Sequence, residues 1–499
     1  MPEPYPDTLH SVAAGRAMDA AIIAAGLPGF QLMQRAADAM WCALARRWPN
    51  AQAITVLAGA GNNAGDGYLI ACLAQRAGYP VRVWAIGDPE KLKGDAALAY
   101  QQALAFGVQV LPWQDDAWLA GVLVDALLGT GVQGAPRAPY SDVIERINAS
   151  GLPVFAVDLP SGLNGATGQA AGTVVRADLT VTVVSLKRGL FTADGPAQVG
   201  ELAFDPLATA PAGVPDERPV RRLTAANLSP VAPRPANAHK GMFGHLLLIG
   251  GDRGTGGAGL LMAEMALRAG AGLVSLATHP DHVAPALARL PEVMVLGVQA
   301  PAQLMALVEK ADILVVGPGL GQGPWGRSLL TLAATTPKPQ VWDADALNLL
   351  AQGLVQLPAN SVITPHPGEA ARLLGTDVAQ VQTDRFAAVQ ALAQRYQCTA
   401  VLKGAGSLIA SADGAISLCD HGHGAMAGAG LGDVLSGLIG ALLGQGLAGF
   451  DAACLAVWLH TRAGQALGRT RGRGLLATDL VPVVRQLLEE HSPCQIPQR

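Results

Sequence analysis

Short apolar runs alternate with amphipathic stretches along most of this 499-residue chain. The runs are rich in Val, Ile and Leu and are too short for ordinary helices, which is typical of parallel strands buried on both faces. Several of the intervening stretches have helical spacing, which indicates strand–helix–strand connections and a parallel α/β sheet with functional loops at the carboxyl ends of its strands. The runs of the first part are 53–59, 81–87, 122–129, 154–160 and 179–185, and the helical patterns are 66–77, 95–106 and 141–148.

The alternation stops between Asp205 and Ala238, where prolines are too frequent for a continuous helix or a central strand. A chain of this length also exceeds one ordinary core. We therefore predict an α/β protein with two domains, residues 1–215 and 220–499, which fold and act separately. The second domain begins a new series of apolar runs at 245–251, 273–278, 313–319, 340–346, 361–369 and 400–407.

The composition argues against several classes of partner. The 34 basic and 38 acidic residues give a net charge of −4, and no dense run of Lys and Arg could follow a phosphate backbone, so we expect no nucleic acid. The longest uncharged stretch, 434–450, is shorter than the roughly 20 residues of a spanning helix, so we expect no membrane. Six cysteines without a CxxC pair favour free thiols in the reducing cytoplasm. A homo-oligomer is compatible with these features.

Two stretches have the GxGxxG spacing of dinucleotide-binding turns, 254–259 and 129–134. The second runs into Pro136 and Pro139 instead of opening a helix, and no acidic residue follows the first at the expected spacing. Tight strand-to-helix turns are the better interpretation of both. The chain also lacks GxxxxGK[ST], which excludes phosphate-loop chemistry.

Polar groups follow three apolar runs of the first domain. In GAGNNAGDG, Asn62 and Asn63 offer amide groups, and Asp66 either caps the following helix or accepts from a ligand hydroxyl. Asp125 and Asp158 stand at the ends of two further runs. Such residues are also common in ordinary turns that bind no ligand. Buried carboxylates on neighbouring strands nevertheless need a counter-ion, a ligand or hydrogen-bond donors, and their recurrence favours a ligand site.

The combination of NNAGDG, VDALLGTG and DLPSG resembles the YjeF N-terminal family, the NAD(P)H-hydrate epimerases, over nearly all of residues 1–215. The resemblance implies a Rossmann-like three-layer α/β/α domain that interconverts the R and S hydrates NADHX and NADPHX. It implies a potassium ion on Asn63, Asp125 and Ser161, and proton transfer at the hydrated ring carbon by Asp158. Ala64 replaces the usual glycine, a one-methyl change that we expect the loop to tolerate. The residues implied to hold the hydrate are Asn62, Asn63, Ala64, Gly65, Asp66, Gly129, Thr130, Gly131, Val132, Gln133, Gly134, Ala135 and Asp158.

In the second domain, residues 425–443 place a glycine-rich stretch before a long apolar helix. Free amide hydrogens at the start of a helix can bind a phosphate. Asp433, in the first turn, is then either a helix cap or a base directed at a substrate hydroxyl. Asp343 and Asp345, in WDADALN, either hold magnesium or cap the helix that follows.

Six motifs in order, HKGMFGHLLLIGG, GPGLG, WDADALN, TPHPGEAARLLG, VLKGAGS and GLGDVLSG, resemble the ribokinase-like NAD(P)H-hydrate dehydratases over about residues 220–495. The resemblance implies dehydration of the S hydrate with ADP and magnesium, which releases AMP and phosphate, and bacterial members of the fused type are similar in using ADP. Asp433 would take the hydroxyl proton. The hydrate would be contacted by Ala258, Gly321, His366 and Asp433, and the adenine nucleotide by Lys403, Gly404, Ala405, Gly406, Ser407 and Gly432. Because the family is usually richer in Gly and Thr before the GD pair, we expect phosphate contacts here from backbone amides.

Two other interpretations fit parts of the sequence. The GxGD motif also occurs in small-molecule kinases. In the first alternative, the second domain is therefore a vitamin kinase fused to a non-catalytic, ligand-binding Rossmann-like domain. Alternatively, the first domain is a binding module, since similar domains occur in an mRNA-decapping scaffold. The presence of Asn63, Asp125, Asp158 and Ser161 together argues against a scaffold, which has no need of an ion and a carboxylate in one site.

Overall fold

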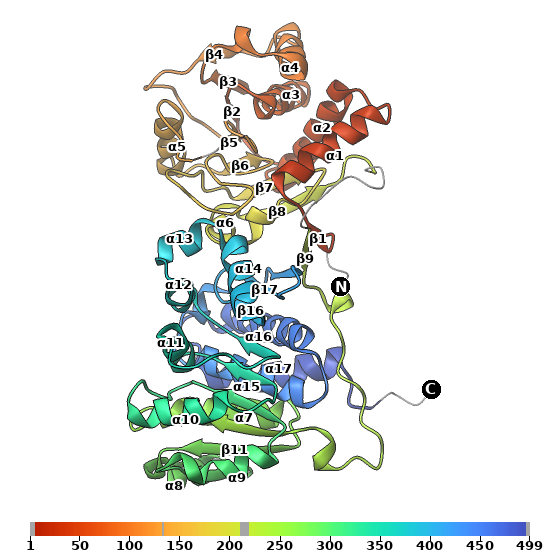
Figure 1. Ribbon diagram of the computed structural model, residues 1–499. Coiled ribbons are helices and arrows are strands. Elements are labelled where there is room, and N and C mark those ends of the chain that lie inside the picture. The colour runs from red at the N-terminus through yellow and green to blue at the C-terminus, as the bar shows by residue number, and fades with distance from the viewer. Residues whose placement is uncertain (1–4, 132–133, 210–218, 496–499) are drawn as a thin grey trace. The chain divides into compact units, whose positions relative to one another are not determined.

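The structure, a computed structural model, describes residues 5–131, 134–209 and 219–495, and it divides into two compact units, Met1–Val220 and Arg221–Arg499 (Figure 1). Each unit has its own parallel or mostly parallel sheet with helices packed on it. The predicted boundary near residue 215 falls outside the described residues.

The first unit contains a seven-stranded sheet in the order β4-β3-β2-β5-β6-β7-β8, and every neighbouring pair is parallel. Helices α2, α3 and α4 bury the larger apolar cluster on one face, and α5 covers a smaller cluster on the other. The strands of this sheet are β2 (Ile54–Ala58), β3 (Val81–Ala85), β4 (Val110–Pro112), β5 (Val122–Ala126), β6 (Val154–Val157), β7 (Leu179–Val183) and β8 (Glu201–Asp205). The unit also contains the short strand β1 (Thr8–Leu9), which is not one of the seven. The helices are α1 (Val12–Ala24), α2 (Gly29–Arg47), α3 (Asn62–Arg76), α4 (Gly94–Ala105), α5 (Tyr140–Ala149) and α6 (Gly195–Gln198), with 3-10 helices at Pro89–Lys91 and Arg188–Phe191.

Helix α3 begins four residues earlier than the predicted start at Asp66. The turn-like composition of NNAGDG concealed this, because its glycines serve close packing instead of a loop. A Cβ on Gly67 would lie 2.6 Å from the Ala126 Cβ, so this glycine lets α3 approach β5. The prediction that Asp66 caps the helix is therefore wrong: Gly61 is the N-cap, and Asp66 lies in the second turn.

The second unit contains a sheet in which β9-β18-β17-β16-β15-β14-β13-β10-β11-β12 are neighbours. The strands from β12 to β16 pair in parallel, whereas β16, β17 and β18 form antiparallel hairpins. The strands are β9 (Val220–Arg222), β10 (His245–Ile249), β11 (Leu273–Thr278), β12 (Met294–Gly297), β13 (Ile313–Val316), β14 (Gln340–Trp342), β15 (Ser361–Ile363), β16 (Thr399–Leu402), β17 (Ser407–Ala410) and β18 (Ile416–Cys419).

Helices α7, α15, α16 and α17 of the second unit share its main apolar cluster, and α10, α11, α12 and α14 cover the other face of the sheet (Figure 1). A Cβ on Gly437 would lie 2.3 Å from the Met262 carbonyl oxygen, so this glycine allows α15 to pack closely on α7. The helices are α7 (Gly256–Arg268), α8 (Val283–Arg289), α9 (Met305–Lys310), α10 (Pro324–Ala334), α11 (Asp345–Ala351), α12 (Pro367–Leu374), α13 (Val378–Thr383), α14 (Arg385–Tyr396), α15 (Leu431–Gly444), α16 (Gly449–Arg471) and α17 (Ala477–His491). The 3-10 helices are Ala225–Asn227, Lys240–Met242, Pro280–His282, Pro301–Gln303 and Gly424–Met426.

The predicted apolar run 400–407 is two strands joined by a turn, not one. β16 ends at Leu402, and Gly404 and Gly406 then adopt φ angles of +137° and +63°, which favour glycine. Inside the proline-rich segment, β9 pairs with β18 as a strand of only three residues. Within the described part of the chain, no helix is long and apolar enough to cross a membrane.

We predict that fragments 1–218 and 219–499 fold independently, because each retains the sheet and the buried apolar clusters of its unit. This cut keeps β9 with the strand that it pairs with. Each purified fragment should give a cooperative thermal melt. Insoluble fragments from a soluble full-length chain would contradict the independence of the two units.

Candidate active sites

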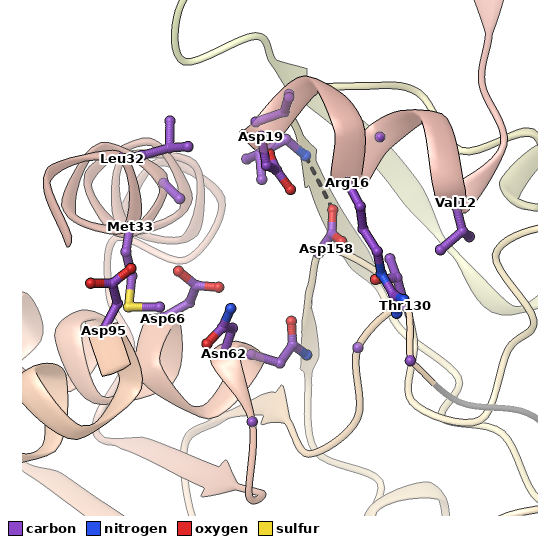
Figure 2. A pocket seen from close by; sticks show the side chains of 18 of the residues that line it. Val12, Arg16, Asp19, Leu32, Met33, Asn62, Asp66, Asp95, Thr130 and Asp158 are labelled. Atoms are coloured by element: carbon purple, nitrogen blue, oxygen red, sulfur yellow. Dashed lines mark hydrogen bonds between the residues drawn. The ribbon is translucent and has the colours of Figure 1, made fainter. Parts of the chain in front are cut away.

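A pocket of about 790 Å³ lies in the first unit at the carboxyl ends of β2, β5, β6 and β7 (Figure 2). Helices α1 and α2 supply further walls, including Arg16 and Asp19. The predicted residues that line it are Asn62, Asn63, Asp66, Gly129, Thr130, Gly131 and Asp158. Ala64 and Gly65 are buried within α3, and Gly134 and Ala135 are not among the lining residues. Val132 and Gln133 lie outside the described residues.

Asp158 follows β6 with a φ angle of +63°, a left-handed conformation that is uncommon outside glycine. Its Oδ1 accepts hydrogen bonds from Thr182 Oγ1 at 2.9 Å, from the Val183 amide at 3.3 Å and from Lys187 Nζ. Lys187 is buried and also donates to the Val183 carbonyl at 2.8 Å. Within the described residues, Asp158 Oδ2 has no hydrogen-bond partner, so one oxygen is fixed by the protein and the other remains available.

Two more carboxyl groups line the same pocket. Burial raises the pKa of Asp66 well above its usual value, and the negative charges of Asp158 and Asp19 add to this effect while Lys187 opposes it. Burial also raises the pKa of Asp19, with Lys187 and Arg16 opposing and Asp158 adding to the rise. Crowding several carboxyl groups around one buried lysine therefore favours the protonated form of Asp66 and Asp19.

Asn63, which lines this pocket, lies close to Ser161 and Asp125, since Asn63 and Ser161 both donate to the Leu128 carbonyl and Ser161 donates to Asp125. Ser161 donates to the fully buried Asp125 through its amide at 2.7 Å and its hydroxyl at 2.6 Å, and Asn63 Nδ2 donates to the Leu128 and Val157 carbonyls at 3.2 Å. Burial raises the pKa of Asp125 to about 6 although the hydrogen bonds from Ser161 lower it. The cluster is rich in oxygen atoms of the hard type that alkali and alkaline-earth ions prefer.

In the second unit, Asp433 lies in the first turn of α15, whose N-cap is Gly430. Asp433 accepts no hydrogen bond from any residue that the structure describes, so the helix-cap interpretation has no contact to support it. Burial raises the pKa of Asp433 to about 6; the nearby Asp343 raises it further and Lys403 lowers it. Above pH 6 this group is mostly an unpaired carboxylate, which suits a base.

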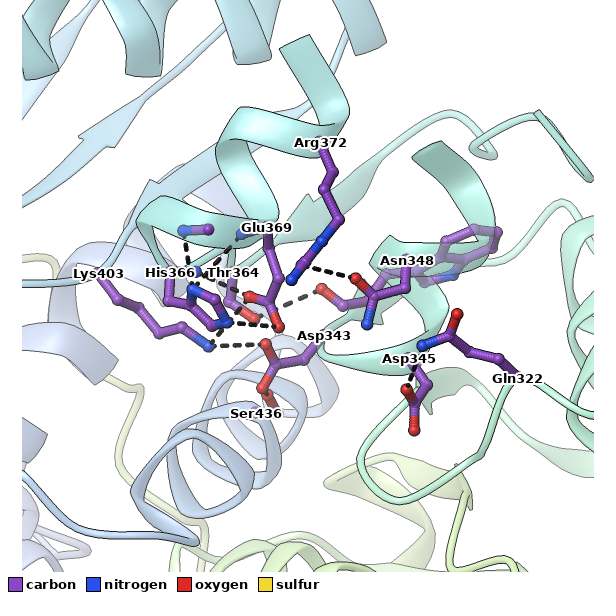
Figure 3. A network of polar contacts seen from close by, with 12 residues as sticks. Gln322, Asp343, Asp345, Asn348, Thr364, His366, Glu369, Arg372, Lys403 and Ser436 are labelled. Atoms are coloured by element: carbon purple, nitrogen blue, oxygen red, sulfur yellow. Dashed lines mark hydrogen bonds and ion pairs between the residues drawn. The ribbon is translucent and has the colours of Figure 1, made fainter. Parts of the chain in front are cut away.

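A polar network lies next to Asp433 at the ends of β14, β15 and β16 (Figure 3). Lys403 Nζ contacts Asp343 Oδ1 at 2.8 Å and lies 3.9 Å from Glu369 Oε2, while Ser436 donates to Asp343 at 3.0 Å. Burial would raise the pKa of Asp343, but Lys403 and the hydrogen bonds outweigh it, so the pKa is lowered. The converse holds for Lys403: burial lowers its pKa, but Asp343 and Glu369 raise it more.

The other predicted residues lie around this network. His366 caps α12, since its Nδ1 accepts from the Gly368 amide at 2.9 Å, and burial and Lys403 lower its pKa. Gly321 donates its amide to Asp345 at 2.9 Å. A Cβ on Gly432 would lie 3.2 Å from Asp343 and 3.3 Å from Lys403, so a side chain here would press against this ion pair.

The remaining predicted residues lie on α7 and in the turn between β16 and β17. Ala258 is on α7, and its Cβ would lie 3.1 Å from a Cβ built on Gly319. Ser407 Oγ donates to the Gly404 carbonyl at 3.1 Å, which closes the turn between β16 and β17 that also contains Ala405 and Gly406.

Comparison with known proteins decides the family. Residues 29–189 match the family described as YjeF-related protein N-terminus, and residues 246–485 match NAD(P)H-hydrate dehydratase. The bifunctional NAD(P)H-hydrate repair enzyme of Coxiella burnetii is 44% identical over 95% of this chain and 98% of its own length. That of Escherichia coli is 44% identical over 93% of this chain and 90% of its own. The chain belongs to the family of bifunctional NAD(P)H-hydrate repair enzymes.

The fold agrees with this membership. A solved ribokinase-like superfamily protein from Enterococcus faecalis superposes with a TM-score of 0.51 at 30% identity, covering 55% of this repair-family chain and 96% of its own. The predicted α/β class, with a Rossmann-like first unit and a ribokinase-like second unit, is confirmed.

Sequence reasoning missed several charged residues of these two sites in the repair-family chain. Lys187 and Asp19 lie outside every motif described above, although Lys187 comes two residues after the apolar run 179–185. Glu369 was visible only as part of TPHPGE. Of the two interpretations of Asp343, the structure bears only on the helix cap: the N-cap of α11 is Ala344, and the Asp343 side chain accepts from Lys403 and Ser436.

We predict that Lys403→Met destabilises the second unit by about 3 kcal/mol, because it leaves the buried Asp343 carboxylate without its counter-ion. Calorimetric melting of the full chain measures this. Arg289→Met is the matched control, since Arg289 pairs with Glu264 on the surface and its loss should cost about 1 kcal/mol or less. Equal melting of the two variants would contradict a stabilising role for the buried pair.

Proposed function

We propose that this protein repairs hydrated NADH and NADPH in two steps. The first unit interconverts the R and S forms of NADHX and NADPHX, and the second unit removes water from the S form with ADP, leaving AMP and phosphate. The observation that carries the proposal is that this chain matches the repair enzymes across both units, each of which has a lysine–aspartate pair and further carboxyl groups at its strand ends. The substrates are small molecules, and the six free thiols support a cytoplasmic location.

In the first site, Asp158 would act through Oδ2, the oxygen that faces no protein donor. Potassium would be held by Asn63, Asp125 and Ser161, whose oxygen atoms fit such an ion because a fully buried carboxylate there benefits from a cation. The ion would supply a positive charge next to the hydrate-binding loop. Nothing in this assignment requires the ion to take part in proton transfer.

In the second site, the hydroxyl of the hydrate is a poor leaving group as hydroxide. Asp433 would remove the hydroxyl proton while the oxygen attacks the terminal phosphorus of ADP, breaking its bond to the bridging oxygen and releasing AMP. Elimination of the resulting phosphate ester, with loss of a proton from the neighbouring ring carbon, restores the reduced nicotinamide. The turn Lys403–Ser407 and the amide of Gly432 would hold the nucleotide.

Magnesium would enter with ADP and neutralise charge on the transferring phosphoryl group. We assign it to the phosphates of the nucleotide. Asp343 is occupied by Lys403 and Ser436, and Asp345 accepts from the Gly321 amide and from Gln322 at 3.2 Å, so both carboxylates already have protein partners.

The alternative, a vitamin kinase fused to a non-catalytic ligand-binding domain, fits less well. It explains only the second unit, whereas the repair enzymes of Coxiella burnetii and Escherichia coli match this chain across both units. Product analysis separates the two functions, since a kinase accumulates phosphorylated substrate and a dehydratase releases NAD(P)H and phosphate.

We predict that the full chain converts a mixed-epimer NADHX preparation completely to NADH when ADP and magnesium are present, measured by absorbance of the reduced nicotinamide. Recovery that stops at the S fraction would contradict the epimerase assignment.

Replacing potassium by sodium should slow R-to-S interconversion measured without ADP. An unchanged rate in sodium would contradict the potassium assignment.

We predict that Asp433→Asn lowers the turnover of S hydrate with ADP by roughly a hundredfold or more, because asparagine keeps the size of the side chain but cannot accept the proton. The wild-type activity should also fall as the pH drops below about 6, where Asp433 becomes protonated. Stability should barely change, since Asp433 accepts no capping hydrogen bond, and a thermal melt is the control. Near-normal turnover in a folded variant would rule out Asp433 as the base.

A further inference from the structure

Asp66 is a carboxyl group directed into the pocket of the first unit without a partner. It lies in the second turn of α3 and lines the pocket with Asp158, as Figure 2 shows. In the part of the chain that the structure describes, no donor forms a hydrogen bond with its side chain. A half-buried carboxyl group that faces a cavity and contributes nothing to the fold through hydrogen bonds is available for a bound ligand.

Asp158, in the same pocket, is held by the protein through one oxygen. Its Oδ1 accepts from Thr182, from the Val183 amide and from Lys187. Lys187, only 5% exposed, is the cation closest to this carboxylate. The free Oδ2 is therefore the atom that can accept a proton.

We propose that Asp66 is the proton donor and Asp158 the proton acceptor of R-to-S interconversion, an inference that rests on the epimerase activity proposed above. Two carboxyl groups whose surroundings differ in this way can serve as acid and base in one site. Lys187 then has a positioning role: it fixes Oδ1 of Asp158 and so directs Oδ2 toward the substrate.

The hydrated ring carbon carries both the hydroxyl and the ring nitrogen. Asp66 gives its proton to the hydroxyl oxygen, the carbon–oxygen bond breaks, water leaves, and the nitrogen lone pair forms a carbon–nitrogen double bond. Water then adds to the opposite face of this cationic carbon, and Asp158 Oδ2 takes the proton that the water loses. One proton has left Asp66 and one has reached Asp158; exchange with solvent returns the pair to its starting state, and the reverse sequence converts S to R.

The charges around Asp66 favour this assignment. Asp158 follows β6, Asp19 faces the site from α1, and Lys187 follows β7; burial and the two acidic groups raise the pKa of Asp66, against the effect of Lys187. Asp95 on α4 also lines the pocket. The residues that α2 contributes to the wall are the uncharged Gly29, Leu32, Met33 and Ala36.

The test is the rate of conversion of purified R-NADHX to the S form by the full chain without ADP, separated by chromatography. Asp66→Asn should lower kcat by about a hundredfold or more with a smaller change in KM. The wild-type rate should fall as the pH rises through the pKa of Asp66, because the donor loses its proton, and this alkaline decline should be absent in Asp66→Asn. Asp66→Glu should restore part of the rate together with the alkaline decline.

The matched control is Asp142→Asn, an exposed aspartate in the first turn of α5 and not a lining residue of the pocket, which should interconvert the hydrates at the wild-type rate. A thermal melt of each variant verifies that the first unit is folded. Wild-type kcat in Asp66→Asn, or a raised KM with an unchanged pH profile, would overturn the donor role and leave Asp66 as a binding residue. A wild-type protein that fails to interconvert the hydrates would overturn the epimerase activity and this inference with it.

Discussion

A lysine–aspartate pair at the strand ends, with one partner buried and the other half-buried, is the interaction on which both sites depend. Lys187 holds Asp158 in the first unit, and Lys403 holds Asp343 in the second at 2.8 Å. A parallel sheet covered by helices on both faces gives a carboxylate at a strand end little water, so an ionised aspartate there needs a cation or several donors. Removing either lysine would leave a charge in the interior, which costs more than the pair contributes when it is intact.

Each pair lies near a carboxyl group that accepts no hydrogen bond from the described residues, Asp66 in the first unit and Asp433 in the second. Both have a raised pKa, and in both cases burial is the largest cause and a neighbouring aspartate adds to it. Asp433, with a pKa of about 6, is mostly ionised at neutral pH and suits a base. At Asp66, burial and the charges of Asp158 and Asp19 favour the protonated form, which suits a group that gives up a proton. Similar electrostatics therefore support opposite proton-transfer roles.

The strands could be predicted from the sequence because burial on both faces leaves continuous apolar runs. β2, β5 and β6 begin within a residue of the runs that indicated them. The start of α3 could not be read in the same way: Gly65 and Gly67 look like turn residues, but a Cβ on Gly65 would lie 2.8 Å from the Met33 sulfur. These glycines are required by contacts with distant segments, which composition does not reveal.

Motifs identified the aspartates of the sites and Lys403, but they did not identify Lys187 or show which lysine pairs with which aspartate. Lys187 is 29 residues from Asp158 in the chain, and Lys403 is 60 residues from Asp343. Neither lysine has a local pattern that marks its partner, because the pairing arises when parallel strands bring their ends to one edge of a sheet. The role of Asp343 was left open in the sequence for this reason, and only the position of Lys403 explains it.

The two reactions proposed for this chain place different demands on their sites, which gives a physical reason for keeping them apart. Interconversion of R and S hydrates returns water to the carbon that lost it, so a proton donor and an acceptor suffice. Net dehydration must instead prevent water from returning, and converting the hydroxyl into a phosphate ester achieves this by providing a better leaving group. A base able to remove the proton from the neighbouring ring carbon would eliminate water in the first site. Confining Asp158 by three donors on one oxygen limits the directions from which its other oxygen can reach the substrate.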